Sequence, residues 1–355
     1  MNTSDKSVKN KREPLYDVIK ALGMISVVIG HCCSNAQMIV FVYSYHLALF
    51  VFVSGLQWKH VQYEGKPFAL VRNRLRTMWR PCFFYMSFFT LTHNLCIAAG
   101  LLYGAQTFTL KDMAVRMLYN VLLMGEEPLG GALWFVPVLL ILQVIFAFVQ
   151  WFAMKISEKY KLLLTMILSV GIGMLGVFCH VKKFEIILQI HTSLLLLPVF
   201  AVGVLLSYFK LDIRKLFRWF WAIPCLMALR YLVFVKGNMI ELSVEEIGSV
   251  GCFYPITFLG VYCMGALAVL INRKKSISKQ FEKIGRYSFD IMALHILVFK
   301  IIDVFIGKLL QAGAGEVGAY PCSYQKIWPV YLACCVIFIP LFREKLTVLM
   351  GKMKR

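Results

Sequence analysis

Residues 15–34 read LYDVIKALGMISVVIGHCCS, an apolar run that is interrupted by Asp17, Lys20 and His31. An α-helix rises 1.5 Å per residue, so about 20 residues cross the hydrocarbon core of a bilayer, which is roughly 30 Å thick. An ionisable residue in such a helix costs about 2.5–3.5 kcal/mol on insertion scales, so it faces protein or water rather than lipid. The run therefore predicts a membrane-spanning helix with a polar face turned into a helical bundle.

The composition of the whole chain agrees with this first helix. Of the 355 residues, 60% are hydrophobic and 16% are charged, and the mean hydropathy is +0.72. Soluble globular domains are much more polar. We expect one all-α domain over residues 1–355, a polytopic membrane helical bundle of about ten transmembrane helices. The expected spans are 15–34, 39–58, 81–104, 133–153, 162–180, 184–207, 217–235, 250–271, 289–310 and 327–342.

The net charge of +20 raises the question of a nucleic-acid ligand, which the distribution of the 38 Lys and Arg residues answers. Alternate connections between the spans, together with both ends of the chain, hold 28 of them, and the opposite connections hold six. Cytoplasmic connections are rich in Lys and Arg. We therefore expect no nucleic-acid partner, and two cytoplasmic tails at 1–14 and 343–355.

Lys20 and His31 lie on one face of the first span. The step of eleven positions from Lys20 to His31 corresponds to roughly 1100° of rotation, almost three full turns, and to a rise of about 16 Å. Lys20 thus lies near the inner surface and His31 towards the outer end. Asp17 and Lys20 also have the i, i+3 spacing of an interfacial ion pair. His31 is a candidate general base, with a hydrogen-bonded structural histidine as the alternative.

The second span, IVFVYSYHLALFVFVSGLQW at 39–58, runs back from the outer side. Its His46 reaches a depth similar to that of His31, and Ser54 comes near the depth of Lys20. The two histidines are therefore candidates to line one cavity, although His46 could instead make only a hydrogen bond across the hairpin.

Two groups of charged residues flank the spans. Arg72, Arg74, Arg76 and Arg80 follow the second span on the cytoplasmic side, where guanidinium groups suit phosphate but also satisfy the positive-inside rule or contact anionic lipid. Glu126, Glu127 and Trp134 mark the outer end of the fourth span, and this combination suits a sugar, although interfacial Trp also serves as an anchor. The ninth span has Arg286 at its inner mouth, with Asp290 and His295 inside.

These motifs resemble the acyltransferase 3 family of bacterial integral membrane proteins. The resemblance rests on DVIKALGMISVVIGH, YHLALFVFVSG, the arginine-rich inner connection, LWFVPVL and IGRYSFDIMALH, which follow one another in the family's order. A basic residue, ten intervening residues and a histidine form the family's hallmark, which Lys20 and His31 reproduce. The family more often has Arg at the position of Lys20, Pro at that of Ala48 and an aromatic residue at that of Leu56.

The resemblance implies a polysaccharide O-acetyltransferase type of enzyme in a bacterial cytoplasmic membrane. Such an enzyme transfers an acyl group, usually acetyl, from cytoplasmic acetyl-CoA or another acyl-CoA to a hydroxyl of a cell-surface or lipid-linked glycan, among membrane lipids and without a metal. On this basis we assign Asp17, Lys20 and His31 to catalysis, Lys20, Ser54, Arg72, Arg74, Arg76, Arg80 and Arg286 to acyl-CoA, and His46, Glu126, Glu127, Trp134 and His295 to the acceptor.

Three alternatives accompany this assignment. Ser54 could act as a covalent nucleophile, but its depth separates it from His31. A transporter of an anionic or lipid-linked metabolite would also need a polar cavity with a basic inner mouth. A scaffold gives no reason for charged residues inside the spans. The sequence predicts neither the acceptor hydroxyl nor the oligomeric state.

Overall fold

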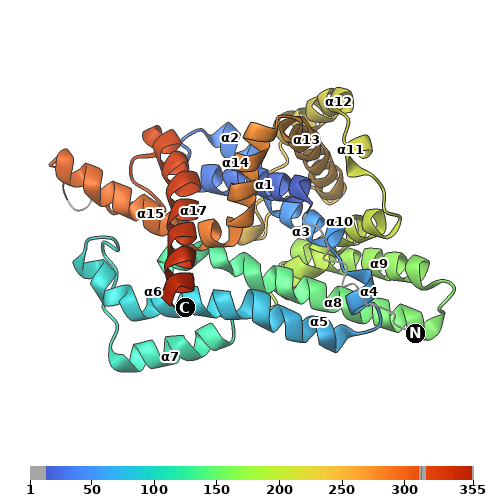
Figure 1. The fold of residues 1–355 in the computed structure, drawn as a ribbon, viewed down its shortest axis with the longest axis horizontal. Helices are drawn as coiled ribbons and strands as arrows, with labels where there is room; N and C mark the ends of the chain where they lie inside the picture. Colours follow the sequence, from blue (N-terminus) through green and yellow to red (C-terminus); the bar gives the residue numbers. More distant parts are fainter. Residues whose placement is uncertain (1–12, 312, 314–316, 354–355) are drawn as a thin grey trace.

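The structure, a computed structural model, describes residues 13–311, 313 and 317–353. This part of the chain is built from helices and contains no β-strand, so the predicted all-α bundle is confirmed (Figure 1). The α-helices are α1 (Pro14–Cys32), α2 (Ala36–Tyr43), α3 (His46–Leu56), α4 (His60–Tyr63), α5 (Pro67–Arg74), α6 (Arg80–Ala98), α7 (Leu110–Val121), α8 (Phe135–Ile156), α9 (Lys161–Lys182), α10 (Ile190–Tyr208), α11 (Ile213–Leu216), α12 (Trp219–Arg230), α13 (Phe253–Arg273), α14 (Lys275–Arg286), α15 (Ser288–Leu309) and α17 (Trp328–Met353).

The predicted number of about ten spans is not confirmed. Among the described residues, 7 helical segments are long and apolar enough to cross a membrane. The predicted spans 81–104, 217–235 and 289–310 correspond to α6, α12 and α15, which lie outside that set. α12 is too short, whereas α6 carries His and Asn side chains and α15 carries four charged ones. The polar content of α6 and α15 places groups inside the bundle that a simple span would lack.

The second predicted span is broken into α2 and α3. The break falls at Ser44 and Tyr45, where two side chains donate hydrogen bonds to backbone carbonyls at the end of α2. The Ser44 hydroxyl donates to the Phe41 carbonyl at 2.6 Å, and His46 Nδ1 lies 2.9 Å from the Val42 carbonyl oxygen. His46 therefore occupies the start of a new helix rather than the middle of a continuous one.

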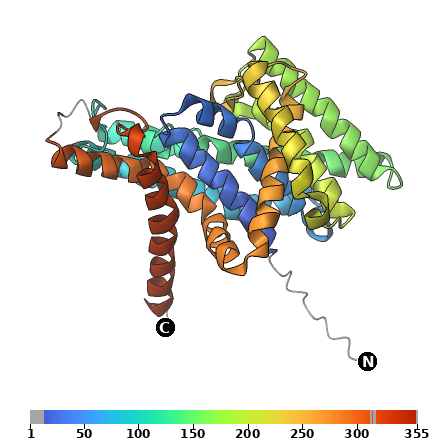
Figure 2. The same ribbon diagram turned by 90° about the horizontal axis from the view of Figure 1, so that it is seen from above.

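The last helix extends further than the sequence predicts. α17 continues to Met353, so most of the predicted tail 343–355 is helical. Residues 1–12 of the predicted tail 1–14 lie outside the described residues. The start of α1 and the end of α17 lie towards the same side of the molecule (Figure 2).

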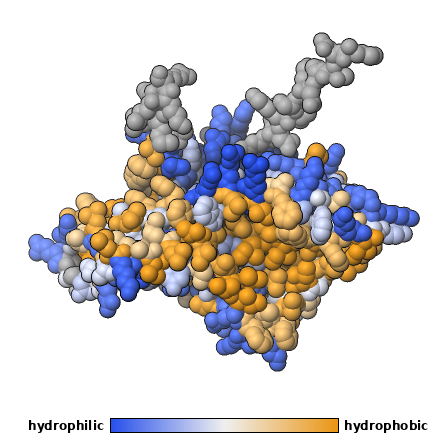
Figure 3. Space-filling model, turned by 90° about the horizontal axis from the view of Figure 1, so that it is seen from below, coloured by the Kyte–Doolittle hydropathy of each residue, from blue (hydrophilic) through white to orange (hydrophobic). Residues whose placement is uncertain are grey.

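The surface has the polarity expected of a membrane protein. Large apolar side chains are exposed along α6, α8, α9 and α17, among them Leu95, Phe152, Ile167 and Phe338. Figure 3 shows a broad hydrophobic band with hydrophilic margins. Lipid rather than water is the solvent that suits this band.

The close packing of α3 on α10 depends on two glycines. A Cβ atom added to Gly55 would lie 2.3 Å from the Phe200 carbonyl oxygen, and one added to Gly203 would lie 2.4 Å from the Phe52 carbonyl oxygen. The two backbones are therefore in direct contact, which in membrane bundles requires small residues. This contact fixes α3, and with it His46, against the centre of the bundle.

We expect Gly203→Leu to destabilise the bundle, because the added side chain has to separate α3 from α10. Overpacking of this kind costs about 1–3 kcal/mol. Thermal unfolding of the purified protein in detergent measures the loss. Gly171→Leu is the matched control, because nothing lies within 4 Å of a Cβ atom at Gly171 in α9. Equal melting temperatures for the two variants would contradict the backbone contact.

Candidate functional site

Three histidines from different helices meet inside the bundle. The ring centroids of His31 in α1 and His295 in α15 are 5.2 Å apart. Tyr43 links this pair to His46, with its ring centroid 6.5 Å from that of His31 and 5.0 Å from that of His46. We call His31, His46 and His295 the histidine cluster. The sequence relates His31 to His46 by depth alone, and the fold adds His295 as a direct neighbour of His31.

Hydrogen bonds define the protonated nitrogen of two of these rings. His46 Nδ1 lies 2.9 Å from the Val42 carbonyl oxygen, and His295 Nδ1 lies 2.9 Å from that of Met292. A carbonyl oxygen only accepts, so in each neutral ring Nδ1 carries the hydrogen and Nε2 is left as an acceptor. His295 is 0% exposed, and its Nε2 has no hydrogen-bond partner among the described residues. The cluster therefore contains a buried basic nitrogen without a protein partner.

A pocket of about 480 Å³ opens on the side of the molecule that holds Lys20. Its polar wall includes Lys20, Ser54 and Arg74, which come from α1, α3 and α5. Lys20 Nζ also pairs with Asp17 at 2.8 Å, so the i, i+3 ion pair is present and leaves Lys20 at the wall of the pocket. We call this cavity the inner pocket.

The inner pocket is lined by residues of the three helices that carry the histidine cluster, although none of the three histidines lines it. Its apolar end is lined by Met24, Phe50 and Met292. Met292 precedes His295 by three positions, Phe50 follows His46 by four, and Met24 precedes His31 by seven, so each lies one or two helical turns from a histidine. A molecule that fills the pocket would contact both the cations Lys20 and Arg74 and apolar side chains on the helices of the three histidines.

Gln143 in α8 is a further part of the inner pocket. Its side chain lines the pocket and is 3% exposed, and its Oε1 atom has no hydrogen-bond partner among the residues that the structure describes. A buried amide oxygen without a partner is costly unless a ligand or water supplies a donor. The signal for Gln143 in the sequence is a polar residue within the predicted span 133–153, although Gln143 is not among the predicted site residues.

The predicted arginine cluster divides between two recesses. Of the four arginines only Arg74 lines the inner pocket. Arg72, Arg76 and Arg80 line a neighbouring recess of about 450 Å³, which shares Asn73 with the inner pocket. Arg286 is exposed at the end of α14 and lines neither.

Three pockets adjoin one another around the segment before α8. Their volumes are about 770, 640 and 550 Å³, and we call them the first, second and third outer pockets. Glu126 lines all three, and Trp134 lines the second and third. The next residue, Phe135, lines the inner pocket instead. The Trp134–Phe135 step thus separates the outer pockets from the inner one.

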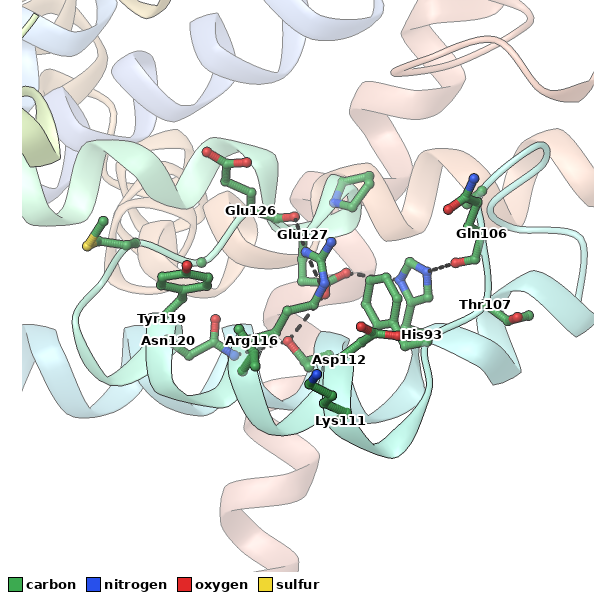
Figure 4. Close-up of a pocket in the computed structure, with 17 residues that line it drawn as sticks. His93, Gln106, Thr107, Lys111, Asp112, Arg116, Tyr119, Asn120, Glu126 and Glu127 are labelled. Carbon is green, nitrogen blue, oxygen red and sulfur yellow. Dashed lines mark hydrogen bonds and ion pairs between the residues drawn. The ribbon is translucent and has the colours of Figure 1, made fainter.

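Glu127 differs from Glu126 because its carboxylate is already bonded to protein. It is 3% exposed, and its Oε2 atom lies 3.1 Å from His93 Nδ1. The Thr90 hydroxyl oxygen lies 3.3 Å from Oε1 and shares its hydrogen between this oxygen and the Met86 carbonyl. Arg116 lies 3.9 Å from the same carboxylate oxygen (Figure 4). Glu127 therefore fixes the wall between the first and second outer pockets.

Two features around the outer pockets, His93 and the helix α7, are not among the predictions from the sequence. His93 lies within the predicted span 81–104, where the rule applied to His31 also identifies it. α7 lies between the predicted spans 81–104 and 133–153, where the sequence analysis predicts a connection and no helix. Thr109 and Asp112 form a capping box, which marks the start of this helix. The hydrogen bonds from Thr109 lower the pKa of the Asp112 carboxyl.

A buried ion pair holds the segment before α17. Asp303 is 0% exposed, and its Oδ2 atom lies 3.4 Å from Lys300 Nζ. It also accepts hydrogen bonds from the Ser323 backbone N–H at 3.0 Å and from the Tyr331 hydroxyl. The segment held in this way carries Tyr320, which lines the second outer pocket. The pair was visible in the sequence as two charges in the predicted span 289–310.

Comparison with known proteins gives one match. Residues 14–342, nearly the whole chain, match the family model described as an acyltransferase domain. No curated protein and no solved structure matches the chain. The resemblance that we inferred from the five motifs is thereby confirmed.

We expect Asp303→Ala to destabilise the fold strongly, because it leaves the Lys300 ammonium buried without its carboxylate. Breaking one partner out of a buried pair costs about 3–5 kcal/mol. Thermal unfolding in detergent provides the measurement. Glu158→Ala is the control, because it removes one partner of the exposed pair with Lys161, which is worth about 0–1 kcal/mol. A similar small effect for both variants would contradict the structural role of Asp303.

Proposed function

The chain belongs to the acyltransferase 3 family and is a membrane acyltransferase, and from that premise we propose that it transfers an acetyl group from cytoplasmic acetyl-CoA to a hydroxyl of a glycan. The observation that carries the proposal is the position of the histidine cluster. It lies one or two helical turns along α1, α3 and α15 from Met24, Phe50 and Met292 of the inner pocket, and the outer pockets begin across the Trp134–Phe135 step. A donor from one side and an acceptor from the other could therefore meet at the histidines.

The inner pocket suits the donor. Acyl-CoA has an anionic phosphate end and a long uncharged arm with amide groups, which ends in the thioester. Lys20 and Arg74 provide cations at the mouth, where they would bind phosphate. Gln143 Oε1 lacks a donor and would accept a hydrogen bond from an amide N–H of the arm. In this pose the thioester lies at the apolar end of the pocket, beside the histidine cluster.

His31 is the general base of the proposed reaction. The acceptor hydroxyl oxygen attacks the thioester carbonyl, and His31 takes its proton as the new ester bond forms. The C–S bond then breaks, and the sulfur leaves as CoA and recovers a proton from the His31 imidazolium, so no covalent enzyme intermediate is needed. His295 supports this role, because its Nε2 atom is available to accept the other N–H of His31 and to orient the ring.

The outer pockets suit the acceptor. Glu126 and Trp134 combine a carboxylate with an aromatic ring, which match the hydroxyls and the apolar face of a sugar. His46, in the same histidine cluster as the proposed base His31, adds an Nε2 acceptor. This arrangement assumes that the side bearing Lys20 is cytoplasmic, in a bacterial inner membrane, as the distribution of Lys and Arg predicts.

We expect His31→Ala to abolish transfer while leaving donor binding intact. Membranes containing the protein are incubated with radiolabelled acetyl-CoA and native surface polysaccharide, and label in the glycan is counted. Loss of the general base lowers the rate about 10²- to 10⁴-fold. Lys20→Ala instead raises the KM for acetyl-CoA about tenfold, because it removes one charged contact to phosphate.

Equal labelling of the glycan by the wild type and by both variants would exclude this mechanism. Lys326→Ala is the control for Lys20→Ala. It also removes a cation, but Lys326 does not line the inner pocket. A wild type that labels no glycan, but whose uptake or export of an anionic metabolite depends on His31, would identify a transporter.

The assumed orientation has its own test. A reporter that is active only in the cytoplasm, fused after Arg355, should be active in cells, because 28 of the basic residues lie in the connections and chain ends assigned to that side. A second fusion, within the connection at Gly237, serves as the control and should be inactive. The reverse pattern would place the inner pocket outside the cell and remove acetyl-CoA as its ligand.

A further inference from the structure

We infer that the first outer pocket, between α6 and α7, binds a sugar unit remote from the acylated hydroxyl, so that the acceptor is an oligosaccharide rather than a single sugar. This inference rests on the proposed function and defines its acceptor. The first outer pocket lacks Trp134, which lines both other outer pockets, yet shares Glu126 with them. The first and second outer pockets share Glu126 and Glu127, so one extended ligand could occupy both.

A buried amide gives the first outer pocket a site for a hydroxyl group. Asn120 lines it and is 1% exposed. Its Nδ2 atom donates to the Thr90 hydroxyl oxygen at 3.0 Å, and the single hydrogen of that hydroxyl is shared between two acceptors, the Met86 carbonyl at 3.0 Å and the Glu127 carboxylate at 3.3 Å. The hydroxyl must therefore accept from Asn120, which fixes the orientation of the amide. Asn120 Oδ1 is left without a partner among the described residues, and a sugar O–H would supply the missing donor.

The charges around the first outer pocket favour a neutral polyol. Its walls carry Lys111 and Arg116 but also Asp112, Glu126 and Glu127 (Figure 4). Arg116 is already engaged, because its guanidinium lies 4.1 Å from the centre of the Phe108 ring and its Nη1 atom lies 3.9 Å from Glu127. A phosphate would meet three carboxylates here, whereas sugar hydroxyls donate to carboxylates and accept from cations.

An aromatic side chain and the size of the site complete the match to an oligosaccharide. Tyr119 lines the first outer pocket and is 46% exposed, so its ring is accessible to the apolar face of a sugar (Figure 4). The outer pockets measure about 770, 640 and 550 Å³. Each is within the usual range for one ligand, about 300–1,000 Å³. The three together exceed what a single sugar would occupy.

The test compares acceptors of different length with a variant of the first outer pocket. Surface polysaccharide of the source cell is hydrolysed and fractionated by size, and transfer of label from radiolabelled acetyl-CoA to each fraction is measured with purified protein. We expect the wild-type kcat/KM to rise from monosaccharides to longer oligosaccharides. Tyr119→Ala should lower kcat/KM for the longer fragments about tenfold through KM, and should leave monosaccharides unaffected.

Leu118→Ala is the matched control, because Leu118 is the adjacent residue of α7, is 60% exposed and does not line the first outer pocket. It should behave as the wild type with every fraction. A wild type that acylates monosaccharides as efficiently as oligosaccharides would overturn the inference, as would an equal loss for all fragments in Tyr119→Ala. Failure of the wild type to label any fraction or the intact polysaccharide would instead refute the proposed function itself.

Discussion

The structure depends on one constraint, which is that a polar group inside a membrane protein must have a partner or face a cavity. In this bundle the constraint has two outcomes. Asp303 and Glu127 are surrounded by protein donors and hold backbone segments in place. His295, Gln143 and Asn120 each keep a buried acceptor atom without a described partner. The bonded carboxylates fix the walls of the pockets, whereas the buried acceptors without a described partner lie in the pockets or near them.

In the proposed reaction, the position of these groups would keep the donor and the acceptor apart until they react. The inner and outer pockets are lined by consecutive residues, Trp134 and Phe135, at the start of α8. The start of α8 therefore separates the inner pocket from the outer pockets. Direct contact between α3 and α10 at Gly55 and Gly203 keeps one wall of this arrangement fixed.

Much of this arrangement follows from the sequence, and the remainder depends on contacts between distant residues. Hydropathy predicts the helical bundle, and helical spacing relates Lys20 to His31. Spacing along one helix does not reveal that His295, 264 positions after His31, is its neighbour. The sequence also does not predict that Arg74 lines the inner pocket while Arg72, Arg76 and Arg80 line the neighbouring recess. That division depends on the packing of α5 against α8. The break between α2 and α3 is likewise invisible to hydropathy, since both halves are apolar.

The anchoring of Tyr320 has a consequence for how the protein is assembled in the cell. Asp303 and Lys300 lie in α15, but one of the donors to Asp303 is the hydroxyl of Tyr331 in α17. Ribosomes deliver the chain from its N-terminus, so α15 enters the membrane before that donor has been synthesised. The second outer pocket is then the last part of the site to form. A chain that stalls or is truncated before α17 leaves the Asp303 carboxylate without the Tyr331 hydroxyl, so its last helices are less stable than those of the full chain.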